Sequence, residues 1–227
     1  MVLRKCGKDE EENMEAEKTM KITWLGHSCF QVESDGYAVV FDPYEDGYVP
    51  GLRPLRVKGN LVLCSHNHGD HNAVQTVDLL PAEGCPFTVK EIPTFHDDQG
   101  GTLRGENRIH ILDNGSLRIA HLGDLGCDLD PEQEKALLDL DAVMIPVGGF
   151  YTIDAVQAKH LVDRIRPRVV IPMHYRSERF GFDVLGTLED FTEQCELVAE
   201  YPGDRLELTK ETRSHIAVLK LPDEGSR

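Results

Sequence analysis

Apolar and β-branched residues recur along the chain in short runs that are separated by turn-forming residues. The Ser-Asp-Gly and Asp-Asn-Gly stretches at 34–36 and 113–115 are typical of hairpin turns. A last pair of strands is expected at Arg205–Leu208 and His215–Leu219. The other runs predict β-strands at Lys21–Leu25, Cys29–Glu33, Tyr37–Phe41, Leu61–Cys64, Phe87–Ile92, Ile109–Leu112, Ser116–Ala120, Ala142–Val147 and Val169–Met173.

Helical patterns are fewer. The clearest predicts a helix over Asp154–Arg166, with apolar residues at helical spacing, an aspartate suited to the N-cap and Pro167 just beyond its end. A Thr-x-x-Asp capping pattern predicts a helix over Thr187–Glu200. Shorter helices are expected at Pro131–Leu140 and Ala73–Leu80. Hairpin-linked strands followed by mixed strand and helix favour an α/β fold, in which helices cover two mixed sheets from outside.

Composition and charge limit the classes of protein. A chain of 227 residues suggests one domain, placed here at 20–222, and the charged segment 1–19 is expected to be a disordered acidic tail. Residues 223–227 are expected to form a short second tail. The net charge of −16 argues against a partner made of nucleic acid.

The six cysteines form no Cys-x-x-Cys pair and are expected to be reduced thiols. No apolar stretch is typical of a secretory signal or a membrane span, which favours a cytoplasmic protein without a membrane partner.

The stretch LVLCSHNHGDHN, residues 61–72, places four good metal ligands directly behind an apolar strand. His66 and His68 point the same way if the backbone is extended, and Asp70 and His71 follow them closely. Three more single residues end other apolar runs, namely His96, Asp124 and His174. If these strands share a direction, all seven side chains meet at one edge of a sheet. Imidazole and carboxylate ligands suit Zn²⁺, Mn²⁺ or Fe²⁺.

The full pattern of H-x-H-x-D-H followed by a lone His, a lone Asp and a lone His resembles the metallo-β-lactamase superfamily. The flanking WLGHSCF, FDPY, HLGDLG and IPMHYR stretches look like its compact bacterial branch, which contains ascorbate-phosphate-lactonase-like hydrolases. The resemblance covers about Met20 to Leu221 and implies a four-layer αββα sandwich. It also implies two divalent metal ions, with Zn²⁺ expected first and Mn²⁺ or Fe²⁺ as alternatives.

The resemblance assigns a role to each candidate ligand. One metal would be held by His66, His68 and His96, and the other by Asp70, His71 and His174, with Asp124 as the bridge between them. Asp42, in FDPY, would support the ligand loop from behind. Redox di-iron members carry H-x-E-x-D in the ligand loop, so His68 in place of the glutamate favours hydrolysis.

A hydroxide bridging the two metals is the expected nucleophile. Asp70 and Asp124 are therefore expected to be catalytic as well as metal-binding. His27, in LGHS, is a third catalytic candidate, although a histidine satisfied in a turn is an equal alternative. A net positive site on an acidic protein favours a small, anionic lactone, ester or phosphodiester. Arg104 and Arg176 are candidate clamps for such an anion. A ribonuclease-type phosphodiesterase and a non-catalytic metal or ligand sensor are the alternative functions.

Overall fold

The structure is a computed structural model, and it describes residues 18–222. Both expected tails therefore lie outside the described residues, except for Lys18 and Thr19. These two residues are tied to the domain, because the Lys18 Nζ donates to the Asn114 carbonyl at 3.0 Å and the Thr19 carbonyl accepts from Ser34 Oγ. Within 18–222 no helix is long and apolar enough to cross a membrane.

The smaller of the two main sheets contains the hairpin-linked strands at the start of the domain. The first three strands of the domain in chain order are antiparallel neighbours, and two strands from later in the chain flank them. The predicted hairpin with its turn at 34–36 is therefore confirmed. The strand order is β13-β1-β2-β3-β5, formed by β1 (Met20–Gly26), β2 (Cys29–Ser34), β3 (Tyr37–Phe41), β5 (Leu61–Leu63) and β13 (Arg205–Leu208).

The larger sheet is mixed and carries the second half of the domain. Its strands are β7 (Thr88–Phe95), β8 (Glu106–Asp113), β9 (Arg118–His121), β10 (Ala142–Pro146), β11 (Val169–Met173), β12 (Val198–Glu200) and β14 (His215–Val218), in the order β12-β14-β11-β10-β9-β8-β7. Parallel pairing joins β9, β10, β11, β14 and β12, whereas β7, β8 and β9 form an antiparallel edge. The antiparallel pair of β8 and β9 confirms the predicted hairpin with its turn at 113–115.

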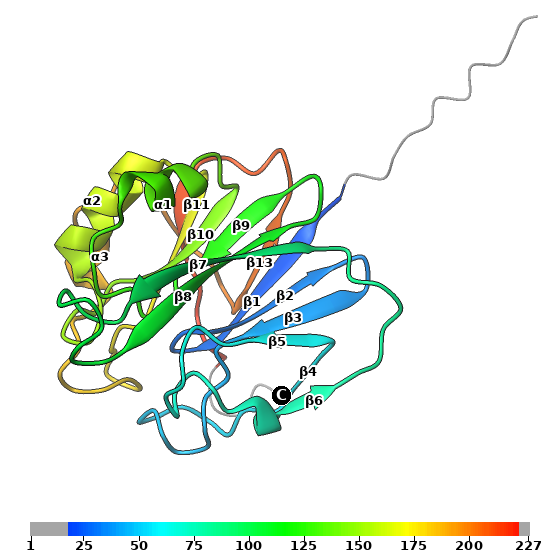
Figure 1. The fold of residues 1–227 in the computed structure, drawn as a ribbon, viewed down its shortest axis with the longest axis horizontal. Helices are drawn as coiled ribbons and strands as arrows, with labels where there is room; N and C mark the ends of the chain where they lie inside the picture. Colours follow the sequence, from blue (N-terminus) through cyan, green and yellow to red (C-terminus); the bar gives the residue numbers. More distant parts are fainter. Residues whose placement is uncertain (1–17, 223–227) are drawn as a thin grey trace, which may run out of the picture.

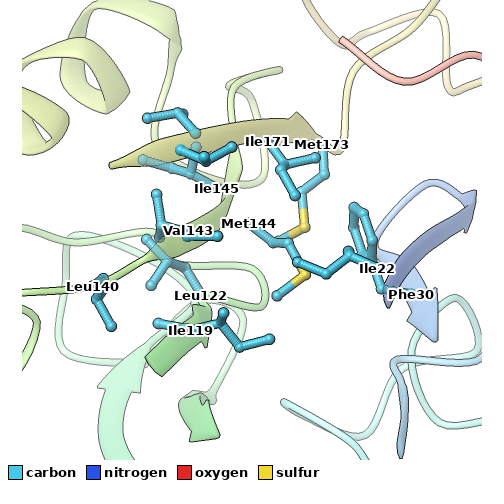
Figure 2. Packing of buried hydrophobic residues seen from close by; sticks show 14 of the residues in the cluster. Ile22, Phe30, Ile119, Leu122, Leu140, Val143, Met144, Ile145, Ile171 and Met173 are labelled. Carbon is cyan, nitrogen blue, oxygen red and sulfur yellow. The ribbon is translucent and has the colours of Figure 1, made fainter. Parts of the chain in front are cut away.

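The main core lies between the two sheets. Figure 2 shows Ile22 and Phe30 of the smaller sheet facing Met144 and Met173 of the larger one, and all four side chains are fully buried. The helices pack on the other face of the larger sheet (Figure 1). They are α1 (Pro131–Ala136), α2 (Ala155–Ile165) and α3 (Glu189–Thr192). The predicted α/β sandwich of two mixed sheets flanked by helices is thus confirmed.

Helix α2 confirms the clearest helical prediction. The Asp154 carboxylate accepts from the Gln157 amide, and the Gln157 side chain accepts in turn from the Asp154 amide, which completes a capping box. The helix ends where Arg166 takes a left-handed conformation, directly before Pro167.

Two helix predictions are wrong. Within 73–80 only Val74–Thr76 forms a turn of 3₁₀-helix, and Val77–Leu79 forms β6, which pairs in parallel with β4 (Val57–Gly59) in a separate two-stranded sheet. Within 187–200 the helix is the single turn α3, because Leu197 adopts a left-handed φ of 55° and the chain then joins the larger sheet as β12. In both cases pairing with a neighbouring strand overrides the local helical pattern.

The last two strands were expected to form a pair, and that expectation is also wrong. β13 pairs with β1 in the smaller sheet, and β14 pairs with β11 and β12 in the larger one. The intervening residues 209–214 therefore carry the chain from one sheet to the other. The five cysteines within 18–222 are free thiols, as expected; Cys6 lies outside the described residues.

Candidate metal centre

The candidate ligands lie in loops that follow the ends of strands from both sheets. The loop with His66, His68, Asp70 and His71 begins just after β5. The remaining three come from the larger sheet and stand directly after or close behind β7, β9 and β11, as His96, Asp124 and His174 respectively. The structure thus brings all seven residues together, at the junction of the two sheets.

These side chains form two groups with one carboxylate between them. The first group is His66, His68 and His96, whose ring nitrogens lie within 4.8 Å of one another. The second is His27, Asp70, His71 and His174, gathered within the same distance.

Asp124 lies between the two groups. Its Oδ2 lies 3.3 Å from the His96 Nε2, 3.2 Å from the His71 Nε2 and 3.1 Å from the His174 Nε2. A single carboxylate oxygen therefore faces histidines of both groups.

Several of the clustered atoms are buried without a hydrogen-bond partner. Within the described part of the chain these include the Nε2 atoms of His66, His71 and His174 and the Oδ1 of Asp124. An unpaired buried polar atom costs free energy, so such a concentration requires an explanation. Neutral imidazole nitrogens and carboxylate oxygens that converge in this way fit one or two divalent cations of the Zn²⁺, Mn²⁺ or Fe²⁺ type.

Asp42 supports the ligand loop from behind, and it does so through three hydrogen bonds. Its carboxylate accepts from the Ser65 amide at 2.7 Å, from the Ser65 Oγ at 2.6 Å and from the His71 Nδ1 at 2.8 Å. The Nδ1 proton of His71 is thereby fixed, which leaves the Nε2 as the nitrogen that faces Asp124 and can ligate a metal once it loses its proton. Because Ser65 Oγ donates to Asp42, it can accept from the His66 Nδ1 at 2.9 Å, which orients a second ligand in the same way.

Three supporting residues were not found from the sequence. Ser65 links Asp42 to His66. Asn107 on β8 accepts from the Asp124 amide at 2.9 Å and donates to the Leu122 carbonyl. Asp97, directly after His96, accepts backbone N–H groups of residues 99, 101, 103 and 104. None of the three belongs to a spacing pattern, so only the assembled loops reveal these roles.

The pKa values reflect the mixture of histidines and carboxylates. Burial acts to lower the pKa of His71, yet Asp124, Asp70 and Asp42 together raise it well above the usual range. Burial acts to raise the pKa of Asp124, and His174 and His71 hold it well below the usual range. Burial lowers the pKa of His66 to about 3. Without a metal, the cluster therefore places a protonated His71 among carboxylates, where a cation is also favoured.

His27 is the member of the second group that lies outside the predicted ligand set, and it is fully buried. Among the described residues neither of its ring nitrogens has a hydrogen-bond partner, and its Nε2 lies 3.4 Å from the Asp70 Oδ2. Its ring stands 4.1 Å from that of His174, and its backbone is left-handed at a φ of 52°. A strained backbone holding an unpaired imidazole beside the ligands is typical of a functional position.

Arg104, Arg176 and His121 make contacts outside the two ligand groups. The Arg104 guanidinium stands 5.6 Å from the centre of the Tyr151 ring. The Arg176 Nε donates to the Leu185 carbonyl at 2.6 Å, so this side chain braces its own loop. His121 bonds to the Ser28 carbonyl at 2.8 Å and stacks on Phe41, outside both ligand groups.

Comparison with known proteins agrees with the fold and the site. The Beta-lactamase superfamily domain matches residues 21–174, so the chain belongs to this superfamily. A UPF0173 metal-dependent hydrolase of Carboxydothermus hydrogenoformans is 29% identical over 198 residues, which cover 70% of this chain and 85% of that protein. One from Methanopyrus kandleri is 27% identical over 235 residues, covering 83% of this chain and all of that protein.

Solved structures show the same architecture. A metallo-β-lactamase superfamily protein of Thermotoga maritima is 30% identical, with a TM-score of 0.69 and coverage of 89% of this chain and 100% of that one. A metallo hydrolase of Ignicoccus hospitalis shares the fold, with a TM-score of 0.60, 21% identity and coverage of 85% and 100% of the two chains. With its clustered His and Asp side chains, the chain is a metal-dependent hydrolase of this superfamily.

Proposed function

We propose that the protein is a binuclear metal-dependent hydrolase of a small, anionic lactone, ester or phosphodiester. The position of Asp124 carries this proposal, because its Oδ2 lies within 3.3 Å of histidine nitrogens from both ligand groups. A carboxylate in that place suits a bridge between two cations. His66, His68 and His96 would hold one ion, and Asp70, His71 and His174 the other. Ions bound there supply Lewis acidity and a water that ionises near neutral pH.

The protein's own residues would hold and orient this chemistry. Asp42 and Ser65 fix the Nδ1 sides of His71 and His66, so the opposite nitrogens face the reaction centre. Asp70, 3.4 Å from His27, has its pKa held far below the usual range, against burial, by His71 and His27. Asp70 therefore stays ionised and can accept a hydrogen bond from the attacking water.

The charge of the loaded site supports an anionic substrate. Two divalent ions would bring four positive charges, against two negative charges from Asp70 and Asp124. The chain as a whole, with these two carboxylates included, carries a net charge of −16, so the attraction of the loaded site acts only at short range. A small substrate that reaches the site is favoured over a long polyanion, which would meet the acidic surface first.

Metal content and hydrolysis together test the proposal. Protein purified without chelator is expected to hold about two equivalents of Zn²⁺, Mn²⁺ or Fe²⁺ by plasma mass spectrometry. A His68→Ala, Asp124→Asn double variant should lose most of this metal. His160→Ala, which changes an exposed histidine on α2, should keep it.

The parent and the two variants are then assayed on lactones, carboxylic esters, phosphodiesters and RNA. Hydrolysis of a small ester, lactone or diester by the parent and by His160→Ala, but not by the double variant, supports the proposal. Turnover of RNA alone would favour a ribonuclease. Metal binding without any turnover would favour a sensor on the same fold.

A further inference from the structure

A row of aromatic side chains begins at the metal centre and runs outward to solvent. Phe182 meets the His27 ring edge-on, with ring centres 5.7 Å apart. The Tyr48 and Tyr151 rings lie 6.4 Å and 6.1 Å from that of Phe182, and Phe150 continues the row at 4.8 Å from Tyr151. We call these four residues, Tyr48, Phe150, Tyr151 and Phe182, the aromatic row.

The row is assembled from three separate loops. Tyr48 follows β3, Phe150 and Tyr151 follow β10, and Phe182 follows β11. Phe150 is 61% exposed and Tyr48 is 46% exposed, so the row is not part of a closed core. Exposed apolar side chains that gather beside a reaction centre are typical of a surface that receives a ligand.

Tyr48 also packs directly against the metal-ligand loop. A Cβ added to Gly69, which stands between His68 and Asp70, would lie only 2.5 Å from the Tyr48 ring. The Tyr48 ring therefore packs on the backbone of Gly69, and any side chain at position 69 would displace the ring. The backbone reinforces the contact, because the Glu45 amide donates to the Gly69 carbonyl at 2.8 Å. Tyr48 is thus held against the ligand loop on one flank, while Phe182 meets His27 on the other.

A cation stands at the far side of the row. The Arg104 guanidinium lies 5.6 Å from the centre of the Tyr151 ring, and within residues 18–222 no ion pair joins it to a carboxylate. Its loop is fixed by Asp97, whose carboxylate accepts from the Arg104 amide at 2.8 Å and from three other amides. Because Asp97 directly follows His96, this loop is anchored at the metal centre. Arg104 therefore offers an unpaired positive charge from a rigid support.

We propose that the aromatic row and Arg104 form the specificity site of the hydrolase, and that it takes an ester or lactone carrying both a flat apolar group and an anionic group. The flat group would lie along Phe182 and Tyr151, and the anion would pair with Arg104. This inference rests on the proposed function and narrows its substrate class. An apolar group on the substrate explains why partly exposed aromatic rings stand beside His27 at the metal centre, which a purely ionic substrate does not require. The observed contact of Arg104 with Tyr151 places both halves of such a ligand side by side.

Binding of two non-hydrolysable anions tests the proposal without requiring turnover. The Zn²⁺-loaded full chain is titrated calorimetrically with benzylphosphonate and with methylphosphonate, which share the anionic head and differ in the ring. We expect benzylphosphonate to bind about tenfold more tightly, as contact with two aromatic side chains allows. Phe182→Leu and Tyr151→Leu should each reduce this ratio to about two or less. Leu197→Ala, which changes a side chain that is 71% exposed beyond α3, should leave the ratio unchanged.

The arginine is tested by the same titrations. Arg104→Gln should weaken both phosphonates by about tenfold and leave their ratio near that of the parent. Arg108→Gln, which removes an exposed arginine on β8, is the matched control and should weaken neither.

Each contrary outcome has a definite meaning. Equal affinities in the parent, or a ratio that survives both Phe182→Leu and Tyr151→Leu, would overturn the role of the aromatic row. An Arg104→Gln variant with parental affinities would overturn the role of the arginine, and a parent that binds neither anion would overturn both. If the expected pattern appears but no ester, lactone or diester is hydrolysed, then the proposed function fails while the binding site stands. If hydrolysis occurs without the expected pattern, then only this inference fails.

Discussion

Replacing Asp42 by Asn removes one negative charge from behind the metal centre while keeping the shape of the side chain. The carboxylate accepts three hydrogen bonds, two from Ser65 and one from the His71 Nδ1. An asparagine can keep its oxygen on the Ser65 amide, but its NH₂ group would then face the Nδ1. That nitrogen must become an acceptor, so the proton moves to the Nε2, where it blocks the side that faces Asp124.

The magnitude follows from the bond that is lost. A hydrogen bond to a charged group contributes about 1.5–3 kcal/mol, which corresponds to about 10- to 100-fold in an equilibrium constant. We therefore expect Asp42→Asn to weaken binding of the metal held by His71 by about 10- to 100-fold. The metal held by His66, His68 and His96 should weaken less, because Asp42 reaches His66 only through Ser65.

The assay is a competition titration of metal-free protein against a chromogenic chelator, which resolves the two equivalents. Asp141→Asn is the control, because Asp141 is also a buried carboxylate but binds Arg118 and Arg168 away from the metal centre. It should lower the free energy of unfolding and keep both metal affinities. The reasoning is refuted if Asp42→Asn binds both equivalents like the parent, or if Asp141→Asn loses metal to the same extent.

Three further predictions follow from the same site. The free energy of unfolding of the metal-free protein should fall as the pH drops from 6.5 to 5, because burial lowers the pKa of His27 to about 4 and that of His66 to about 3, so these groups take up protons only when unfolded. A depressed histidine pKa gives stability above pH 6.5 that is lost on acidification. The unfolding free energy, measured with urea at several pH values, should therefore change less with pH in His27→Gln than in the parent. An equal pH dependence in the two proteins would contradict this. Metal binding at pH 7 should release about one proton from His71, because the surrounding carboxylates raise the pKa of this histidine against the effect of burial. Calorimetric binding enthalpies that are the same in buffers of different ionisation enthalpy would show that no proton is released. Gly126→Ala should cost about 1–3 kcal/mol and weaken metal binding, since the new Cβ would lie 2.4 Å from the backbone carbon of His96, whereas Gly203→Ala meets nothing within 4 Å and should leave thermal unfolding unchanged.

Much of the scaffold could be predicted from the sequence because its core strands are apolar runs of ordinary length. Tyr37–Phe41 and Val169–Met173 were predicted with the bounds that the structure shows. The three-residue strands β4, β6 and β12 could not be predicted. They are too short to show a period, and only their partners make them strands. The same lack of local signal explains the wrong pairing of β13 with β14, which lie in different sheets.

Some residues of the metal centre could be found from the sequence, and others could not. The seven ligand candidates could be found because metal-binding residue types stand behind apolar strands, and the structure gathers them at one place. The roles of Asp97 and Asn107 could not be found, because each acts through backbone groups of other residues. The aromatic row was equally hidden, since its members come from three loops that only the fold brings together. If the proposed specificity site is correct, these rings would bind an apolar part of a substrate for which the charge of the site predicts only an anionic group.

The pairing of β13 with β1 bears on how the chain folds during synthesis. Met20 pairs with Leu208 and Thr23 with Arg205, so β1 leaves the ribosome long before the strand that pairs with it. Until β13 arrives, β1 has an open hydrogen-bonding edge that other nascent chains could join. Such long-range pairing is slow to form, because closing a long loop precedes any gain from the contact. Release of a chain truncated before residue 205 is therefore expected to yield aggregates rather than a smaller, soluble domain.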